Sequence, residues 1–279
     1  MSSITFKEND FQNKKGTANF SLCCATHSFP HKNKLDISSF LGQSDTEKNL
    51  PDSKRKRISF DPYRDLQLTA FSWRIIKGND LSLKYSKIFT KRMSDHIFRQ
   101  LEDEVVYFGG DLLKVKVFGK WHNIPRKQAA YGHPGLSYAF SGNCLPAVPW
   151  QNCNIIKQLK EVVESVTNCK FNFVLVNRYK DGSDHMGEHR DDEKDLVPEA
   201  PIASLSFGQA RDFIFRHKDC RKKTEKPDAS LNVRKLELEH GSLLLMEWPT
   251  NKFWYHSLPI RKKAPNVRIN LTFRQMVIK

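Results

Sequence analysis

Hydrophobic and polar residues alternate with period two along much of the C-terminal half of the chain. This alternation is typical of β-strands with one buried face. Short turn segments separate the alternating stretches, and no helical pattern lies between them. Seven stretches are therefore expected to be strands: 171–179, 202–208, 211–217, 231–238, 241–247, 253–259 and 267–274. Consecutive strands without intervening helices predict an antiparallel sandwich or jelly roll, and not a doubly wound sheet.

The preceding part of the chain has a mixed pattern. Residues 88–106 and 155–168 place apolar residues at roughly helical spacing and are expected to form amphipathic helices. Residues 112–118 alternate like a strand, and the Gly119-Lys120 pair predicts a hairpin turn after it. The expected fold class is therefore mainly β with flanking helices (α+β).

The first 60 residues have no persistent apolar period. Ser, Asn, Lys, Asp and Thr dominate them, which is typical of a disordered arm. The arm closes with the basic tetrad Lys54–Arg57, a candidate nuclear localisation signal, so we expect the protein in the nucleus. The alternative is that the tetrad is only a solvated run of charge in a linker.

The charge balance points to a polyanionic partner. The chain of 279 residues has 46 Lys and Arg against 31 Asp and Glu, a formal net charge of +15. Nucleic acid is the first candidate and an anionic membrane surface the second. No apolar run approaches the roughly 18 residues of a transmembrane helix, and the N-terminus does not resemble a secretory signal. The 6 cysteines lack a C-x-x-C pair, which argues against a zinc finger and a disulfide scaffold.

Three residues that are far apart in the chain form a candidate metal site. His189 and Asp191 lie two positions apart in an extended segment, so their side chains point to the same face. His256 lies in the strand predicted over 253–259 and is a third candidate ligand. Two histidines and one carboxylate leave coordination positions open, which suits Fe(II) that binds oxygen and a cosubstrate. A histidine in an apolar strand is more often a packed residue, and zinc bound by His185 and His189 is a further alternative.

The last predicted strand has one apolar face and one polar face that carries two arginines. Arg268 and Arg274 differ by an even number, so both side chains point the same way. Two guanidinium groups on one face need anions beside them, and a small dicarboxylate in bidentate pairing would satisfy this need. The alternative is an exposed edge strand whose polar face lies in water. Asn177 and Tyr179, at the polar end of an earlier strand, are candidate hydrogen-bond partners of the same ligand or ordinary strand-end residues.

The ordered series NRYKDGSDHMGEHRDDE, WYHSLP and RINLTFR resembles the AlkB family of Fe(II)- and 2-oxoglutarate-dependent dioxygenases, over about residues 70–275. The resemblance implies a nucleotide-recognition lid with supporting helices (61–150) and a double-stranded β-helix, or jelly-roll, core (151–279). The disordered basic arm (1–60) precedes them and does not match the family. The resemblance also implies two sets of ligands. The iron ligands would be His189, Asp191 and His256, and the 2-oxoglutarate ligands Asn177, Tyr179, Arg268, Arg274 and, as an assisting group, Thr272.

The resemblance further assigns a pocket for a damaged base. Tyr138 and Phe140, two apart in LSYAF, would line one side, and the His189 ring would lie on the other side of the base. Glu193 would lie near the exocyclic amine. The activity implied is oxidative removal of N-alkyl groups with O2, which releases formaldehyde, succinate and CO2. The substrates would be 1-methyladenine and 3-methylcytosine, with etheno adducts as further candidates.

The implied partner is double-stranded DNA. The family's duplex-probing finger maps to Val117 and Phe118 at the predicted hairpin tip, where an exposed aromatic side chain can act as a wedge between base pairs. Arg126 and Arg216 are candidate phosphate contacts. Two alternatives remain: an RNA or single-strand demethylase of the same chemistry, and a non-catalytic nucleic-acid-binding module. A monomer is expected, and the family's short sliding-clamp motif is not visible in the arm.

Overall fold

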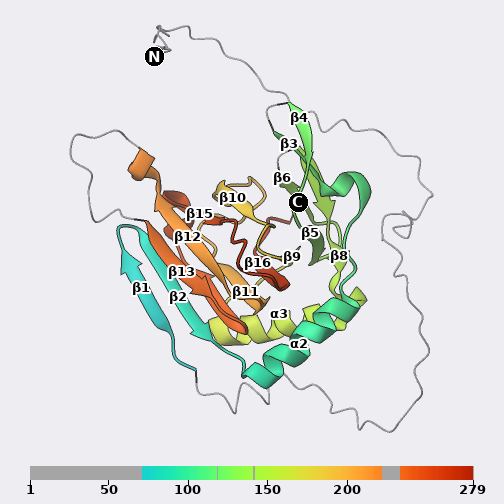
Figure 1. The fold of residues 1–279 in the computed structure, drawn as a ribbon, viewed down its shortest axis with the longest axis horizontal. Helices are drawn as coiled ribbons and strands as arrows, with labels where there is room; N and C mark the ends of the chain where they lie inside the picture. The colour runs from blue at the N-terminus through green and yellow to red at the C-terminus, as the bar shows by residue number, and fades with distance from the viewer. Residues whose placement is uncertain (1–70, 118, 141, 222–232, 279) are drawn as a thin grey trace, which may run out of the picture. The chain divides into compact units, whose positions relative to one another are not determined.

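The structure is a computed structural model that describes residues 71–278, apart from 118, 141 and 222–232 (Figure 1). The expected arm and its basic tetrad lie outside the described residues. All seven predicted C-terminal strands are confirmed, with boundaries within three residues of those expected. They are β9 (Phe173–Tyr179), β11 (Ile202–Gly208), β12 (Arg211–His217), β13 (Arg234–Leu238), β14 (Ser242–Met246), β15 (Trp254–Leu258) and β16 (Arg268–Arg274).

Two sheets contain these strands. An eight-stranded sheet has the order β1-β2-β14-β11-β16-β9-β5-β8, and a four-stranded sheet has the order β10-β15-β12-β13. All neighbours are antiparallel except β5 and β8. The strands not named above are β1 (Arg74–Gly78), β2 (Leu81–Lys87), β5 (Lys127–Gly132), β8 (Val148–Pro149) and β10 (Met186–His189). The expected jelly-roll fold is confirmed, and its larger sheet takes strands from both sides of the expected boundary after residue 150.

The two predicted helices are also present, as α2 (Lys91–Glu104) and α3 (Asn154–Thr167). Helix α2 begins after Thr90, whose side-chain oxygen accepts a hydrogen bond from the Met93 backbone N–H at 3.2 Å. Both helices lie side by side against the eight-stranded sheet (Figure 1). Their buried residues join one apolar core with the strand residues that face them, including Ile269 and Leu271. No described helix is both long and apolar enough to cross a membrane.

Strand β16 lies in the middle of the larger sheet, between β11 and β9. All seven of its residues are buried. Ile269, Leu271 and Phe273 pack toward the helices, whereas the alternate residues point to the opposite face. The alternative of an exposed edge strand is therefore wrong: the polar face of β16 is enclosed, and its two arginines are among the buried residues.

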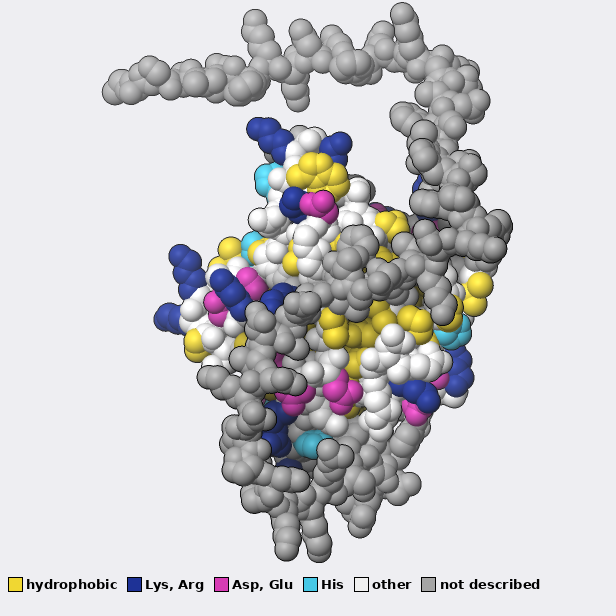
Figure 2. All heavy atoms as spheres, turned by 90° about the vertical axis from the view of Figure 1, so that its right-hand side faces the viewer, with side chains coloured by type: hydrophobic (Ala, Val, Ile, Leu, Met, Phe, Trp, Pro, Cys, Tyr) yellow, Lys and Arg dark blue, Asp and Glu magenta, His cyan; other side chains and the backbone are white. Residues whose placement is uncertain are grey.

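Two small hairpins lie outside these two sheets. The first consists of β3 (Lys114–Val117) and β4 (Lys120–Asn123), and the second of β6 (Ser137–Phe140) and β7 (Asn143–Pro146). The predicted turn is confirmed, with Gly119 at φ +78°, but residues 112 and 113 belong to a 3-10 turn instead of the strand. Lys and Arg side chains gather around the projecting end of the first hairpin (Figure 2).

Candidate active site

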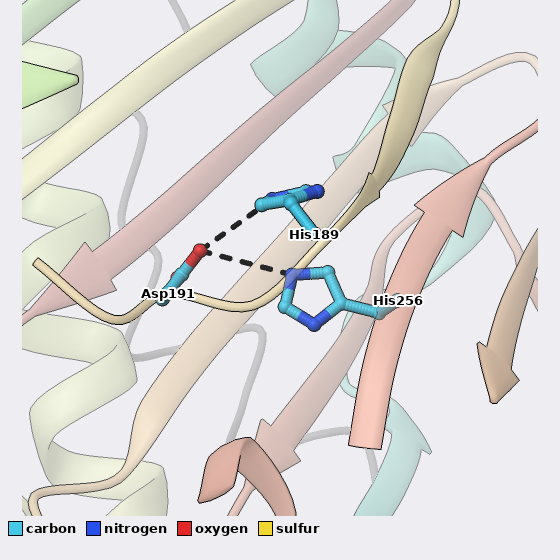
Figure 3. A group of neighbouring side chains, drawn as sticks. All are labelled: His189, Asp191 and His256. Atoms are coloured by element: carbon cyan, nitrogen blue, oxygen red, sulfur yellow. Dashed lines mark ion pairs between the residues drawn. The ribbon is translucent and has the colours of Figure 1, made fainter. Parts of the chain in front are cut away.

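The three predicted metal ligands meet between the two sheets. His189 ends β10 and is the direct cross-strand partner of His256 on β15. The chain then turns so that Asp191 reaches back toward both rings (Figure 3). The Asp191 Oδ1 atom lies 3.5 Å from His189 Nε2 and 3.7 Å from His256 Nε2. One donor atom from each of the three residues lies within 4.8 Å of the others, so all three can bind one ion.

The surroundings of this triad fit a divalent iron ion. Asp191 Oδ1 is buried and has no hydrogen-bond donor among the described residues, although it faces two imidazole nitrogens. The Nδ1 atom of His189 lies 2.9 Å from the Gly187 carbonyl oxygen, which fixes the ring and leaves Nε2 toward the ion. Two histidines and one carboxylate are the donor set of non-haem Fe(II) oxygenases. His185, the zinc alternative, does not belong to this group.

Charged groups around Asp191 keep its carboxylate ionised, so that it can bind a cation. Burial disfavours the charged carboxylate, but Arg274 and the two histidines hold the pKa of Asp191 well below its usual range. Burial lowers the pKa of His256, which favours the neutral ring that binds metals. His189 is half-buried, and although desolvation opposes its charged form, the hydrogen bond and charge of the adjacent Asp191 raise its pKa. The carboxylate is therefore ionised, and a bound cation would compete with protons for the histidines.

Asp191 is held in place from two sides. Arg274 donates from Nη2 and Nε to Asp191 Oδ2, at 2.7 and 3.0 Å. The Asn251 side chain accepts the Asp191 backbone N–H at 3.1 Å and donates to the Asp191 carbonyl oxygen. Arg274, expected among the cosubstrate ligands, thus contacts a metal ligand directly.

Arg268 lies at the opposite end of the polar face of β16. Only 2% of the residue is exposed, and among the described residues no carboxylate pairs with it. Its Nη2 donates to the Ser206 hydroxyl at 3.0 Å, and its guanidinium carbon lies 5.3 Å from the centre of the Tyr179 ring. Burial lowers the pKa of Arg268 to about 10. The Arg268 Nε and the Tyr179 hydroxyl have no hydrogen-bond partner in the described part of the chain. A buried cation without a counter-ion is costly, so this end of the strand fits the carboxylate of a small ligand.

Neutral polar groups lie between the two arginines on the polar face of β16. Thr272 donates to the Asn270 side-chain oxygen at 3.1 Å, and Asn270 donates to the Ser204 hydroxyl at 2.8 Å. These groups line one cavity of about 720 Å³ together with the triad and Arg274. Sequence reasoning missed Asn270 and Ser204 as site residues. Asn270 is evenly spaced from Arg268 and Arg274 in the sequence, and Ser204 is evenly spaced from Ser206. The alternation of side chains along a strand therefore places each on the same face as these polar neighbours.

Asn177 on β9 closes another side of this cavity. Its side-chain oxygen accepts hydrogen bonds from Arg126 Nε at 2.8 Å and from Gln128 Nε2 at 2.9 Å. Arg126 also donates to the His185 carbonyl oxygen at 3.2 Å. Arg126, a candidate phosphate contact, is thus half-buried in the cavity wall, and Gln128 is a lining residue that the sequence did not single out.

The expected base pocket is partly assembled at the same cavity. Tyr138 is buried, stacks on Phe173 with 5.7 Å between ring centres, and donates from its hydroxyl to the Glu193 carboxylate. Burial and the nearby Asp191 raise the pKa of Glu193. Arg216 pairs with Glu188 at 2.9 Å on the rim. The side chains of Val117, Phe118 and Phe140 lie outside the described residues.

Comparisons with known proteins agree with this geometry. The sequence model of the 2OG-Fe(II) oxygenase superfamily matches residues 83–274. The mouse DNA oxidative demethylase ALKBH2 is 56% identical over 205 residues, which cover 74% of this chain and 84% of that protein. The human protein of the same name is 54% identical over 207 residues, 74% of this chain and 78% of its own. Mouse alpha-ketoglutarate-dependent dioxygenase alkB homolog 3 is 38% identical over 152 residues, 54% of this chain and 51% of its own. The predicted resemblance is confirmed: the chain belongs to the 2OG-Fe(II) oxygenase superfamily and, within it, to the AlkB family.

Proposed function

We propose that this protein is an Fe(II)- and 2-oxoglutarate-dependent DNA oxidative demethylase. The observation that carries the proposal is the pairing of two features on opposite ends of β16. Beside the Arg274 end the triad can hold iron, and at the Arg268 end the buried guanidinium has no carboxylate partner among the described residues. The names of the relatives, which are 50–56% identical, support DNA as the substrate.

Separate groups of residues along β16 would bind iron and 2-oxoglutarate. His189, Asp191 and His256 would bind iron, which together with 2-oxoglutarate and O2 supplies the oxidation of an N-alkyl carbon. Arg268 would pair with the distal carboxylate of 2-oxoglutarate, because Ser206 and the Tyr179 ring already orient its guanidinium.

The remaining cosubstrate ligands would orient 2-oxoglutarate between these ends. Asn177 and Thr272 line the cavity that also contains the triad, and both side chains are fixed by hydrogen bonds. A ligand that meets prearranged groups loses less conformational freedom on binding. Arg274 would act mainly through Asp191, whose second oxygen it holds.

The damaged base would enter from the side of Tyr138. The base must leave the duplex stack, which costs about a few kcal/mol. A methyl group on N1 of adenine or N3 of cytosine already disrupts pairing and so lowers this cost. The base would lie between the Tyr138 and His189 rings, with Glu193 toward its exocyclic amine. Tyr138 and Glu193 are linked by a hydrogen bond, so either one positions the other.

A substrate panel tests this proposal. The protein is supplied with Fe(II) and 2-oxoglutarate and given 1-methyladenine in duplex DNA, in single-stranded DNA and in RNA. We expect formaldehyde from DNA, and none when iron or 2-oxoglutarate is omitted. Release from RNA alone would favour the RNA demethylase. No release from any substrate, with nucleic-acid binding intact, would favour a non-catalytic module.

We further propose that duplex DNA is preferred. The exposed lysines Lys116 and Lys120 on the first hairpin support this, because they can approach phosphates while the tip probes the stack. Phe118→Ala should reduce repair of duplex DNA more than repair of single strands. Equal loss on both substrates would reject the wedge.

We also propose that the protein acts in the nucleus. The basic tetrad Lys54–Arg57 and the net charge of +15 support this location. A fluorescent fusion of the full chain should concentrate in nuclei, and replacement of the tetrad by alanines should spread it through the cell. If the replacement leaves nuclear accumulation unchanged, the tetrad is only a solvated run of charge in a linker.

A further inference from the structure

A second group of aromatic rings and cations lies beside the metal-ligand segment. We call it the α4 patch, after the short helix α4 (Thr250–Phe253) that carries part of it. It consists of Lys218, Trp248, Lys252 and Phe253. The Lys252 ammonium lies 5.3 Å from the centre of the Trp248 ring and 5.6 Å from that of Phe253, and the Lys218 ammonium lies 4.2 Å from the Phe253 ring.

The patch presents its groups to solvent in a fixed arrangement. Trp248 is 42% exposed, which is unusual for so large a ring. Lys252 is exposed, and neither it nor Lys218 forms a salt bridge with another described residue. Phe253 stacks on His217 with 6.0 Å between ring centres and 6° between planes, which anchors the patch to β12. The cations therefore keep their charge available, and the rings keep their orientation.

The patch is continuous with the active site. Arg190, between the two metal ligands of the 189–191 segment, donates to the Lys252 carbonyl oxygen at 2.7 Å. Asn251, the neighbour of Lys252, holds the Asp191 backbone. A polymer that follows the surface from the cavity would therefore reach the α4 patch within a short distance.

Aromatic rings interleaved with lysines are typical of surfaces that bind single-stranded nucleic acid. Bases of a single strand stack on aromatic side chains, and the phosphates between them pair with cations. An acidic peptide would use the lysines but would leave the Trp248 ring without a partner. We propose that, when the substrate is a single strand, the α4 patch binds the unpaired nucleotides that flank the extruded base. A base stacks on Trp248, and Lys252 and Lys218 pair with the backbone. This inference rests on the proposed function and extends its substrate contacts beyond the cavity.

The affinity of unmethylated oligonucleotides tests the patch itself. Fluorescence anisotropy is measured with a labelled single strand of about 15 nucleotides on the full chain. Trp248→Ala should weaken binding about fivefold or more, and Trp248→Phe should retain most of the affinity. Lys252→Ser should reduce the slope of log affinity against log salt by about 0.7. Ile75→Ala and Lys77→Ser, on the exposed strand β1, are matched controls and should change neither quantity.

Substrate length separates this role from structural damage. Formaldehyde release is compared on a methylated trinucleotide, which fills only the cavity, and on a methylated strand of about 15 nucleotides. Trp248→Ala should lower the release from the long strand and leave that from the trinucleotide unchanged. Equal loss on both, or the same loss in the control variants, would overturn the inference. If the wild type releases formaldehyde from neither substrate, the proposed function fails. The affinity for unmethylated single strands still tests whether the α4 patch binds nucleic acid.

Discussion

Arg274 and Asp191 form an ion pair in which two of the three guanidinium nitrogens, Nη2 at 2.7 Å and Nε at 3.0 Å, contact the same carboxylate oxygen. The other oxygen of Asp191 is thereby directed at His189 and His256. Both partners are buried, so the pair is screened little by solvent. An arginine that the resemblance assigns to the cosubstrate therefore also orients a metal ligand.

This pair predicts that Arg274→Ala weakens metal binding as well as cosubstrate binding. Removal of a group that orients a metal ligand typically lowers metal affinity about 10- to 100-fold. Titration of the protein with Fe(II) under anaerobic conditions, with Lys91→Ala as a surface control, measures the effect. If only the concentration of 2-oxoglutarate needed for turnover rises, Arg274 serves the cosubstrate alone.

Arg268→Lys should raise the KM for 2-oxoglutarate by about tenfold or more. A lysine keeps the charge but lacks the planar fork that pairs with a carboxylate through two hydrogen bonds. Tyr179→Phe should raise it less, because only one hydroxyl is lost. The KM for methylated DNA should stay near that of the wild type in both variants. A KM for 2-oxoglutarate that does not change in Arg268→Lys would place the distal carboxylate elsewhere.

Gly182→Ala should destabilise the protein by about 1–3 kcal/mol through overpacking. A Cβ atom at this position would overlap the Arg261 carbonyl oxygen and lie 2.6 Å from its carbonyl carbon. The Gly182 N–H also donates to the Ala264 carbonyl oxygen at 2.6 Å, which holds the two loops together and opposes the movement that a Cβ atom would require. Chemical denaturation measures the difference. Gly109→Ala, where a Cβ meets nothing within 4 Å, is the control and should change stability little.

Glu164 should contribute stability only above acidic pH. Its carboxylate accepts the Phe171 backbone N–H at 2.9 Å and pairs with Lys160 at 2.9 Å. Burial opposes its ionisation, but these donors hold the pKa of Glu164 below its usual value of 4.5. Because the folded state has the lower pKa, the contribution is full above the unfolded value and is lost as pH falls through the folded value.

Glu164→Gln is therefore expected to cost about 1 kcal/mol of unfolding free energy at pH 7. Urea denaturation at several pH values compares the variant with the wild type. The difference should shrink below about pH 4. A difference that is constant down to pH 3 would mean that the charge of Glu164 contributes nothing.

The two helices and the seven C-terminal strands could be predicted from the sequence because each has a clear period. The two arginines on one face of β16 were also predictable, since side-chain direction alternates along a strand. The enclosure of that face was not, because the pairing of β16 with β9 and β11 depends on residues far away in the chain. Strands β1, β2 and β5 were not predicted from the sequence, and the places of β2 and β5 in the larger sheet likewise depend on pairing with strands far away in the chain.

Part of the site also could not be predicted. Ser204, Asn270 and Gln128 are neutral polar residues whose role depends on the groups they meet. Arg126 was expected to reach phosphates, but its half-buried side chain donates to Asn177 in the cavity wall. The metal ligands and the two arginines of β16 could be identified from the sequence, because the type and the spacing of their side chains together limit which ligands they can bind.

The central claim is that His189, Asp191 and His256 hold the metal that couples 2-oxoglutarate to dealkylation. Its most direct test is the amount of succinate and formaldehyde formed from methylated duplex DNA by the iron-loaded protein and by His256→Ala. The account predicts equal amounts of the two products from the wild type and neither from the variant. Undiminished formaldehyde from His256→Ala, or formaldehyde without succinate from the wild type, would contradict it.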